Sequence, residues 1–514
     1  MLIADGATVL LGTGNFDSTK LYRRPSGSRI SGPDSHGAML PHGKVSYTWG
    51  MQRLRVALVN PPPAFLHEPQ YDTPEFTRLG LACLAAYLRD RAPDEFDILV
   101  LDAKFERLGY DEVDARLAAF RPDVLGLTAF TNEIVPAGEV GARAKKRDAT
   151  LRVVIGGVHV SALPERTLQE FPAFDIGVVG EGEETFLELL RAWKNGKESL
   201  AAIPGLVTPG GLTAPRPRIG DQTLLPRPAW DLLPPSKIAL VMTSRGCPFA
   251  CNFCMNPNGR IVRKRGVDQV LEEIAWLVRE RGARHLIFCD EIFTVDKNRA
   301  HAVLDGMLGL NFGPGSLTFS AQTHVNCIDE PLLAKMREAG VTTLGFGIET
   351  ADPEALAQMG KGTNLQKIRH AVDLAKKTNV GLTTYFILGQ PNETWTSAWR
   401  SLWFAARINP VLPIFGIMVP YPGTKVWQWA QSGERGYRLK STNWNDFNKQ
   451  LGKALELEHL SRRQLEVLQL MGYLMVFITN LRLGDLVRFL WRYRKEGVQL
   501  VRKIAAPTMS SSSA

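Results

Sequence analysis

The chain has 514 residues, of which 45% are hydrophobic and six are cysteines, so it is long enough for two or three domains and unlike a disulfide-stabilised secreted scaffold. The net charge of +9 is spread along the chain, with no arginine-aromatic array, so no nucleic-acid partner is expected. No apolar run reaches the roughly 18 residues of a membrane span. The few cysteines fit a reducing cytosol, so a cytoplasmic location is expected.

Residues 1–50 are rich in glycine, serine and proline and show no sustained apolar period, which predicts a disordered extension. Regular structure is predicted to begin abruptly after Met51. One hypothesis is that Met51 is the initiator and that the preceding residues are an artefact of gene prediction. Mass spectrometry of the native N-terminus tests it.

Residues 54–200 alternate short apolar runs with amphipathic stretches such as Leu79–Leu88 and Glu133–Lys146. Buried strands separated by helices predict a parallel, doubly wound, Rossmann-like sheet. The predicted strands are Val56–Val59, Ile98–Leu101, Val124–Leu127, Val153–Ile155 and Ile176–Val179.

Polar residues and glycines follow these predicted strands, at the edge where doubly wound sheets bind their ligands. Glycines at this edge allow a bulky planar ligand to approach the backbone. His159 is either a ligand contact or a structural cap of its loop. The candidate ligand-binding residues are Asn60, Thr128, Gly156, Gly157, His159, Glu181 and Gly182.

Residues 203–236 contain eight prolines, a density that does not build helices or interior strands. This segment is predicted to be a connector that wraps the surface. Residues 237–430 then return to strand-helix repeats, which predict a partial (β/α)6 barrel of the TIM type with its functional residues at the carboxyl ends of the strands.

The barrel prediction rests on six strands and on the helices between them. The predicted strands are Ile238–Met242, His285–Cys289, Leu317–Ala321, Thr343–Gly347, Gly381–Ile387 and Ile414–Val419. The predicted helices are Val267–Arg281, Pro331–Ala339, Leu365–Lys377 and Thr394–Ile408.

Three cysteines, Cys247, Cys251 and Cys254, follow the first of these strands, with three and then two residues between them. This spacing places three thiolates on one loop, close enough to hold three irons of a four-iron, four-sulfur cluster, which normally takes four cysteines. An iron without a protein ligand can bind a small chelating molecule. The alternatives are a zinc site, which requires a fourth Cys or His, a disulfide framework, or unrelated buried cysteines.

The cysteine loop resembles that of the radical S-adenosylmethionine (SAM) superfamily, with Phe253 as the usual aromatic residue before the last cysteine. The resemblance implies that SAM binds the open iron through its amino and carboxylate groups. It also implies that an electron, delivered by a donor such as flavodoxin or ferredoxin, cleaves SAM to a 5'-deoxyadenosyl radical.

Two further motifs resemble SAM-binding segments of this superfamily. Gly345, Gly347 and Glu349 resemble its Gly-Gly-Glu motif, which holds the amino group of SAM, and the turn at Gly389 resembles its adenine-contacting turn. Glu349 is otherwise a helix cap. Glu393, after that turn, is equally well explained as charge in the first turn of a helix.

Other polar residues end the barrel strands without an assigned role. His324 lies where relatives usually carry an arginine, so a contact with SAM would require its protonation. Asp290 and Glu291 either bind substrate or SAM, or are exposed loop residues. Cys289 and Cys327 are expected to be small packed residues.

Followed by a radical SAM motif, the first domain resembles the cobalamin-binding domain of one radical SAM class. This class includes the anaerobic magnesium-protoporphyrin ester cyclase and the hopanoid methylases. Residues 101–106 lack the histidine of the Asp-x-His-x-x-Gly signature that supplies a cobalt ligand in other cobalamin proteins. A degenerate domain that binds nothing is the alternative.

The resemblance implies an enzyme that methylates an unactivated carbon of a small, hydrophobic metabolite, using a 5'-deoxyadenosyl radical and methylcobalamin. Oxidative cyclisation without methyl transfer is the first alternative. A non-catalytic cobalamin or iron-sulfur sensor is the second, although a sensor would not need Glu349.

The region 435–505 is predicted to be helical. Val467–Ile478 is apolar but too short to cross a bilayer, and Leu481–Lys503 is basic and amphipathic. Such a helix is expected to pack as a lid across the barrel mouth, or to contact the inner membrane face peripherally.

Overall fold

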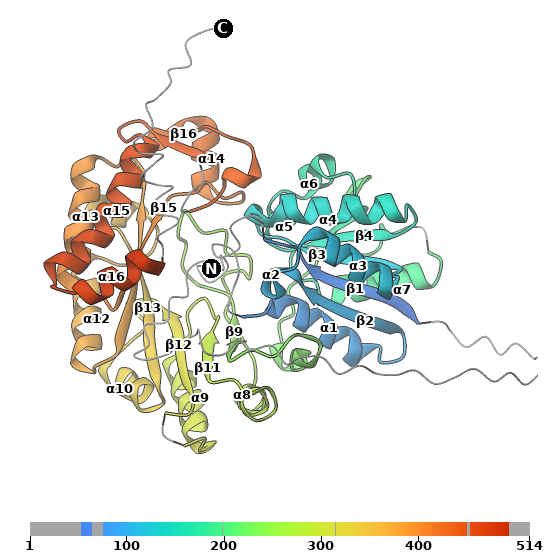
Figure 1. Cartoon of the computed structure of the whole chain (residues 1–514), viewed down its shortest axis with the longest axis horizontal. Helices are drawn as coiled ribbons and strands as arrows, with labels where there is room; N and C mark the ends of the chain where they lie inside the picture. The colour runs from blue at the N-terminus through green and yellow to red at the C-terminus, as the bar shows by residue number, and fades with distance from the viewer. Residues whose placement is uncertain (1–52, 64–75, 198, 314, 450–452, 493–514) are drawn as a thin grey trace, which may run out of the picture.

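The computed structural model describes residues 53–63, 76–197, 199–313, 315–449 and 453–492. The predicted extension at residues 1–50 and the role of Met51 lie outside these residues. Figure 1 shows two α/β units side by side, with the barrel on the left and the N-terminal sheet on the right.

The N-terminal unit contains a seven-stranded sheet in the order β2-β1-β3-β4-β5-β6-β7. All five predicted strands are present and run parallel, whereas β6 and β7 are antiparallel. The strands are β1 (Leu54–Asn60), β2 (Phe96–Asp102), β3 (Val124–Thr128), β4 (Arg152–Gly156), β5 (Ile176–Val178), β6 (Leu206–Thr208) and β7 (Gly211–Leu212).

The strands β6 and β7 lie inside the proline-rich segment that was predicted to be a connector only. Pro204 and Pro209 flank β6 and do not interrupt its ladder, so a short strand next to the sheet edge is compatible with them. The rest of this segment runs between the two units.

Helices cover both faces of the sheet because alternate residues of β1 enter two different cores. Val56 and Leu58 pack with the core that includes α1 and α7, and Ala57 and Val59 pack with the core that includes α3 and α4. The helices are α1 (Leu79–Arg91), α2 (Ala103–Glu106), α3 (Tyr110–Phe120), α4 (Ile134–Arg147), α5 (Val158–Ala162), α6 (Pro164–Glu170) and α7 (Glu183–Lys194).

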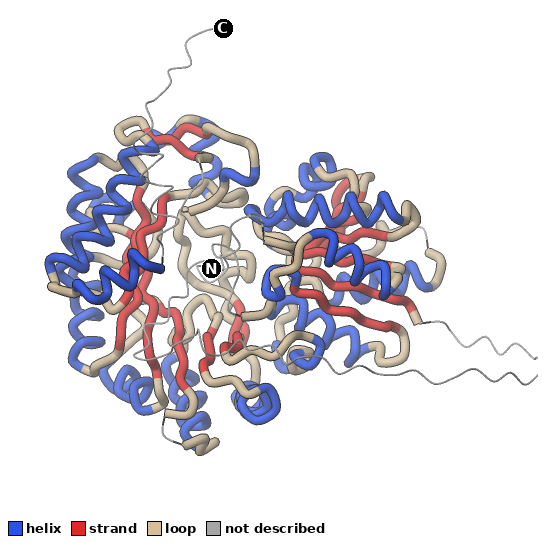
Figure 2. Tube along the Cα trace, viewed as in Figure 1, coloured by secondary structure: helices blue, strands red, loops and turns tan. Residues whose placement is uncertain are grey.

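The second unit is a six-stranded parallel sheet in the order β15-β14-β13-β12-β11-β8, curved as an open barrel (Figure 2). The strands are β8 (Ile238–Val241), β11 (His285–Phe288), β12 (Thr318–Thr323), β13 (Val341–Glu349), β14 (Gly381–Leu388) and β15 (Leu412–Ile417). A two-stranded ribbon of β9 (Ser244–Arg245) and β10 (Arg263–Lys264) brackets the cysteine loop.

Helices cover the outer face of the barrel and include the four that were predicted. They are α8 (Val267–Arg281), α9 (Lys297–Gly309), α10 (Glu330–Glu338), α11 (Pro353–Gln358), α12 (Leu365–Lys377) and α13 (Trp395–Ile408). The sequence-based prediction did not include α9 or α11.

The chain ends in the expected helices, but a short hairpin that was not predicted precedes them. After α14 (Lys425–Ser432), a hairpin of β16 (Tyr437–Leu439) and β17 (Leu455–Leu457) precedes α15 (Arg462–Thr479) and α16 (Leu483–Arg492). Helix α15 covers the edge strand β15: Gln469 donates to the Phe415 carbonyl at 2.6 Å, and the Phe415 N–H donates to the Tyr473 hydroxyl at 3.3 Å. Within the described residues, no helix is long and apolar enough to span a bilayer.

The described part of the predicted lid does not lie across the barrel mouth. Arg482, which precedes α16, donates to the carbonyls of Pro410 and Val411 at 2.6 and 2.8 Å. These residues lead into β15, so they lie at the amino ends of the strands, whereas the cysteine loop follows the carboxyl end of β8. Residues 493–503 lie outside the described residues.

Candidate functional site

The cysteine loop is a tight excursion between β9 and β10. Gly246 has φ +111°, and a Cβ there would overlap the Ile261 carbonyl, so only glycine fits. The Cys247 N–H donates to the Gly259 carbonyl at 2.9 Å, which closes the loop.

The three cysteines of this loop, Cys247, Cys251 and Cys254, are half-buried and are not joined in disulfides, and all three line one cavity of about 220 Å³. Burial raises the pKa of Cys251 to about 12, although the nearby Lys361 ammonium opposes this effect. Among the described residues, no three His, Cys, Asp or Glu side chains are arranged to share one metal ion. In a cluster each thiolate binds its own iron, so the three sulfurs need not converge.

Glu349 ends β13 with φ +67° and lines the same cavity, together with Gly345 and Gly347. One oxygen of its carboxylate pairs with the Lys361 ammonium, which also donates to the Gly347 carbonyl at 2.6 Å. The other oxygen, Oε2, is buried and has no hydrogen-bond partner within the described chain. A buried carboxylate oxygen without a partner is costly, so this atom is suited to a cationic ligand.

His324 lines this cavity as a neutral ring. Its imidazole stacks on Phe249 of the cysteine loop, with ring centroids 3.8 Å apart, and its Nε2 lies 3.0 Å from the Lys361 carbonyl. Burial and the neighbouring Lys361 lower the pKa of His324 to about 4. His324 therefore braces two loops and is not the protonated ring that a contact with SAM was expected to require.

A second cavity, of about 400 Å³, lies at the carboxyl ends of β1, β3, β4 and β5. Gly157, with φ +101°, approaches the Ala129 carbonyl so closely that a Cβ would lie 2.7 Å from its oxygen. Six of the seven predicted ligand-binding residues line this cavity: Asn60, Thr128, Gly156, Gly157, Glu181 and Gly182.

The seventh predicted residue, His159, does not line either cavity. Its ring packs edge-on against Trp444 at a centroid distance of 4.7 Å, and its Nδ1 lies 3.3 Å from the Thr131 hydroxyl. Burial lowers the pKa of His159 to about 3, so the ring is neutral. This environment matches the structural alternative for His159.

The two cavities adjoin each other, because Phe130, Val158 and Glu291 line both. Glu291 accepts hydrogen bonds from the Gly246 N–H at 3.1 Å and the Asn258 amide at 2.6 Å. The ligand-binding edge of the N-terminal sheet therefore faces the barrel mouth.

Comparison with known proteins assigns a family to both halves of this arrangement. The B12 binding domain family matches residues 72–190, and the Radical SAM superfamily matches residues 241–404. An uncharacterized methyltransferase of Pyrococcus horikoshii is 34% identical over 413 residues, which cover 78% of this chain and 87% of that protein. The chain belongs to the radical SAM superfamily, in the class with a B12-binding domain.

Two other relatives of this radical SAM protein have names that state an enzymatic activity. The anaerobic magnesium-protoporphyrin IX monomethyl ester cyclase of Rubrivivax gelatinosus is 28% identical and covers 72% of this chain and 68% of its own. The hopanoid C-2 methylase of Rhodopseudomonas palustris is 28% identical, and the match covers 68% of this chain and 64% of that protein. The predicted class is confirmed.

The fold is also that of a solved radical SAM protein. The structure of the methyltransferase TsrM from Kitasatospora setae has a TM-score of 0.64 and 19% identity, and the match covers 83% of this chain and 89% of that one. The predicted order of a doubly wound domain followed by a partial barrel is therefore confirmed.

The residues of this radical SAM protein fit the cofactors of its class. The three thiols would hold a [4Fe–4S] cluster, and the unpartnered Glu349 Oε2 would accept the SAM ammonium.

The other two predicted SAM contacts differ in position. Phe253 lines the cluster cavity, whereas Gly389 does not. Phe386 and Ile387, which precede Gly389 on β14, do line it. The Gly389 N–H donates to the Glu393 carboxylate, so Glu393 closes the turn. Burial raises the pKa of Glu393 to about 8.

A buried polar cluster on the wall of the B12-domain cavity was not predicted. Arg78 donates to Asn60 Oδ1 at 2.9 Å and to Glu133 at 2.6 Å, and Lys104 also donates to Glu133 at 2.7 Å. Burial acts to raise the pKa of Glu133, but Arg78 and Lys104 outweigh it and lower the pKa to about 2. In the sequence, the only local sign of this cluster is that the charged residues Asp102 and Lys104 lie two positions apart within residues 101–106.

Among the described lining residues of this cavity there is no histidine. Lys104 lies within the region that matches the histidine signature, and its ammonium is held by Glu133. A corrinoid bound here would therefore have no histidine from the described wall for its cobalt.

Of the remaining candidates, Asp290 has a structural role. Asp290 is buried and accepts from the Thr243 N–H at 3.0 Å and the Ser244 hydroxyl at 2.6 Å, so it supports the start of the cysteine ribbon. Cys289 lies 3.4 Å from the Val241 carbonyl, and burial raises its pKa well above the usual range. Cys327 is half-buried.

Proposed function

We propose that this cobalamin-dependent radical SAM enzyme methylates an unactivated carbon of a small, hydrophobic molecule. The observation that carries the proposal is the shared wall of Phe130, Val158 and Glu291. A methyl donor held in the B12-domain cavity would lie next to a substrate held in the barrel cavity. Methyl transfer between two separate ligands requires this proximity.

The barrel cavity supports a hydrophobic substrate. Apart from the cysteines and the Glu349 region, its walls are largely apolar, and apolar walls favour an apolar ligand. These walls include Phe253, Met255, Ile292, Ile414, Ile417, Met418 and Val419.

The bound cofactors would supply a 5'-deoxyadenosyl radical and a transferable methyl group. The chain itself would hold the cluster through Cys247, Cys251 and Cys254 and orient SAM through Glu349. The apolar walls would exclude water from the reacting carbon. The electron would come from a small donor such as flavodoxin or ferredoxin.

Anaerobic reconstitution with iron, sulfide, hydroxocobalamin and SAM, with dithionite or flavodoxin as reductant, tests the proposal. Candidate substrates come from metabolites that accumulate in a deletion strain. Methyl transfer yields S-adenosylhomocysteine together with 5'-deoxyadenosine. Oxidative cyclisation is the second candidate, because some relatives are named as magnesium-protoporphyrin ester cyclases. Formation of 5'-deoxyadenosine without S-adenosylhomocysteine would indicate it. Binding of cobalamin without any SAM cleavage would indicate a sensor.

We also propose that α16 rests on an anionic lipid surface from the cytoplasmic side. Leu483, Val487 and Leu490 lie on one face of α16 and are 57%, 64% and 47% exposed, and Leu481 before the helix is 84% exposed. The opposite face packs inward through Phe489, whose ring lies 4.7 Å from that of Tyr473. An apolar face next to the arginines of a basic segment is typical of helices at a membrane surface.

A further inference from the structure

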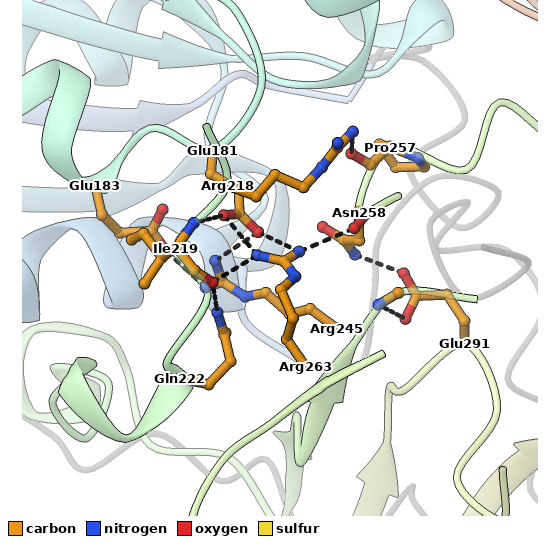
Figure 3. Close-up of polar contacts among 11 residues, drawn as sticks. Glu181, Glu183, Arg218, Ile219, Gln222, Arg245, Pro257, Asn258, Arg263 and Glu291 are labelled. Carbon is orange, nitrogen blue, oxygen red and sulfur yellow. Dashed lines mark hydrogen bonds and ion pairs between the residues drawn. The ribbon is translucent and has the colours of Figure 1, made fainter. Parts of the chain in front are cut away.

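Two carboxylates of the B12-binding domain reach across to the ribbon that carries the cysteine loop (Figure 3). Glu183 is the first residue of α7 and Glu181 lies two residues before it, and Arg245 and Arg263 lie on β9 and β10. Arg263 Nη2 is 2.7 Å from Glu181, and Arg245 Nη2 is 2.6 Å from Glu183. The four side chains are at most 11% exposed.

The Glu181–Arg263 pair gathers three segments at one point. Arg263 Nη1 donates to Glu181 Oε2 and to the Ile219 carbonyl, both at 2.9 Å, and Nη2 donates to the Asn258 carbonyl at 2.9 Å. Glu181 Oε2 also accepts from the Ile219 N–H at 3.0 Å. The connector and the C-terminal arm of the cysteine loop are therefore fixed to the B12-binding domain.

The Glu183–Arg245 pair fixes the other arm of the loop. Arg245 directly precedes Gly246 and Cys247, and it also lies 3.4 Å from Glu181. From the barrel side, Glu291 holds the Gly246 N–H and the Asn258 amide. Both arms of the cysteine loop are thus held on one side by Glu181 and Glu183 of the B12-binding domain and on the other by Glu291 of the barrel (Figure 3).

Glu181, Glu183 and Arg245 also line the 400 Å³ cavity. The wall of the cobalamin cavity is thus joined to Cys247 through direct contacts. Buried, multiply hydrogen-bonded ion pairs of this kind have a narrow range of geometries. A change at the cavity wall would move the cysteine loop, and movement of the loop would change the wall.

We infer that Glu181–Arg263 and Glu183–Arg245 are positioning pairs that couple cofactor binding in the two domains. This inference rests on the proposed function. The pairs set the separation of the corrinoid and cluster sites, so cobalamin in one cavity changes the affinity for SAM in the other. By linkage, SAM changes the affinity for cobalamin by the same factor.

The test measures SAM affinity of the cluster-loaded protein with and without saturating hydroxocobalamin, together with iron content and the EPR spectrum of the reduced cluster. For the natural protein we expect the two dissociation constants to differ about fivefold or more. In E181Q and E183Q, each loaded with iron and measured with hydroxocobalamin saturating at that variant's own dissociation constant, the ratio should fall to within about twofold of one. These variants keep the side-chain size and remove the charge.

Glu184→Gln is the matched control, because Glu184 lies on the same helix and pairs with Arg216 at 3.2 Å outside the cavity wall. It should keep the natural ratio. If E181Q does not fold, E183Q, which leaves Glu181–Arg263 intact, carries the test. The coupling would be overturned if the SAM dissociation constants of the natural protein with and without hydroxocobalamin were nearly equal. It would also be overturned if their ratio in E181Q and E183Q were the same as in the natural protein. Failure of the natural protein to bind SAM or cobalamin at all would instead refute the proposed function.

Discussion

The ammonium group of Lys361 pairs with the carboxylate of Glu349 at the end of β13, and both are buried beside the cysteine loop. Lys361 lies between Gly360 and Gly362, both at positive φ, which brings its side chain back under the loop. The pair leaves one Glu349 oxygen for a ligand. Lys361 is therefore a positioning residue for the proposed SAM site.

Lys361→Met removes the contact that fixes the Glu349 carboxylate next to the Gly347 carbonyl, so the carboxylate is no longer oriented toward the SAM ammonium. We expect SAM to bind about tenfold more weakly, equivalent to roughly 1.4 kcal/mol, with iron content unchanged. Equilibrium binding of SAM to the reconstituted protein measures this. Lys367→Met, at an exposed position of α12, is the control. Tighter binding in K361M would show instead that Lys361 competes with the ligand.

Cys251→Ala removes one of the three thiolates proposed for the cluster. We expect loss of the visible absorbance of the cluster and of reductive SAM cleavage, because two thiolates cannot hold the cluster in place. Iron analysis and 5'-deoxyadenosine formation report these losses. Cys327→Ala should retain both properties. A C251A protein that still cleaves SAM contradicts the assignment.

Acid should destabilise the fold through its buried histidines. Burial lowers the pKa of His159 to about 3 and the pKa values of His285 and His324 to about 4. The unfolded chain binds these protons below about pH 6.5, so this stability is fully present above that pH; it is lost between about pH 6.5 and 4 for His285 and His324, and down to about pH 3 for His159.

Each of these histidines contributes on the order of 3 kcal/mol to this loss. Thermal unfolding followed by circular dichroism at pH 7 and pH 5 should show a smaller decrease in Tm for His324→Gln than for the natural protein. His370→Gln, at an exposed position, should behave like the natural protein. Equal decreases for all three proteins would exclude a role for His324.

Gly157→Ala places a Cβ against the Ala129 carbonyl at an unfavourable φ. We expect a loss of about 1–3 kcal/mol of stability and weaker binding of hydroxocobalamin, because the loop lines that cavity. Difference absorbance and thermal unfolding measure the two effects. Gly309→Ala, where the added methyl meets open space, provides the comparison. Unchanged binding by G157A would show that the loop does not contact the corrinoid.

Replacing Leu483, Val487 and Leu490 together by serine removes the apolar face of α16 and leaves α15 in place. We expect the natural chain to float with vesicles of phosphatidylglycerol and phosphatidylcholine, and the triple variant to stay in the soluble fraction. The double variant of Leu212 and Leu224 to serine, at other exposed leucines, should float normally. If the natural chain does not float, or the triple variant does, the membrane contact is refuted.

Local signals in the sequence were sufficient for most of the fold. The bounds of α8 and α12 agree with prediction, since Gly282 ends α8 in the left-handed conformation and Asn364 caps the start of α12. The apolar spacing of Ala300, Val303, Leu304 and Met307 would also have identified α9. The β16–β17 hairpin joins strands separated by a long segment, and no local period reveals such a pairing.

The candidate site likewise contains residues that the sequence identified and residues that it did not. The cysteines and Glu349 occur in contiguous motifs, so spacing and resemblance identified them. The cluster of Arg78, Lys104 and Glu133 is formed by three separate segments that meet only in the fold. Its members are charged residues that sequence alone would place on the surface.

Edge strands of open sheets are available for pairing with other chains. The side chains of α15 already use the main-chain N–H and C=O of Phe415 at the middle of β15. A foreign strand therefore finds the middle of this edge already hydrogen-bonded, which limits edge-to-edge pairing on the open side of the barrel. The barrel interior can thus stay wide enough for cofactor and substrate without closing into eight strands.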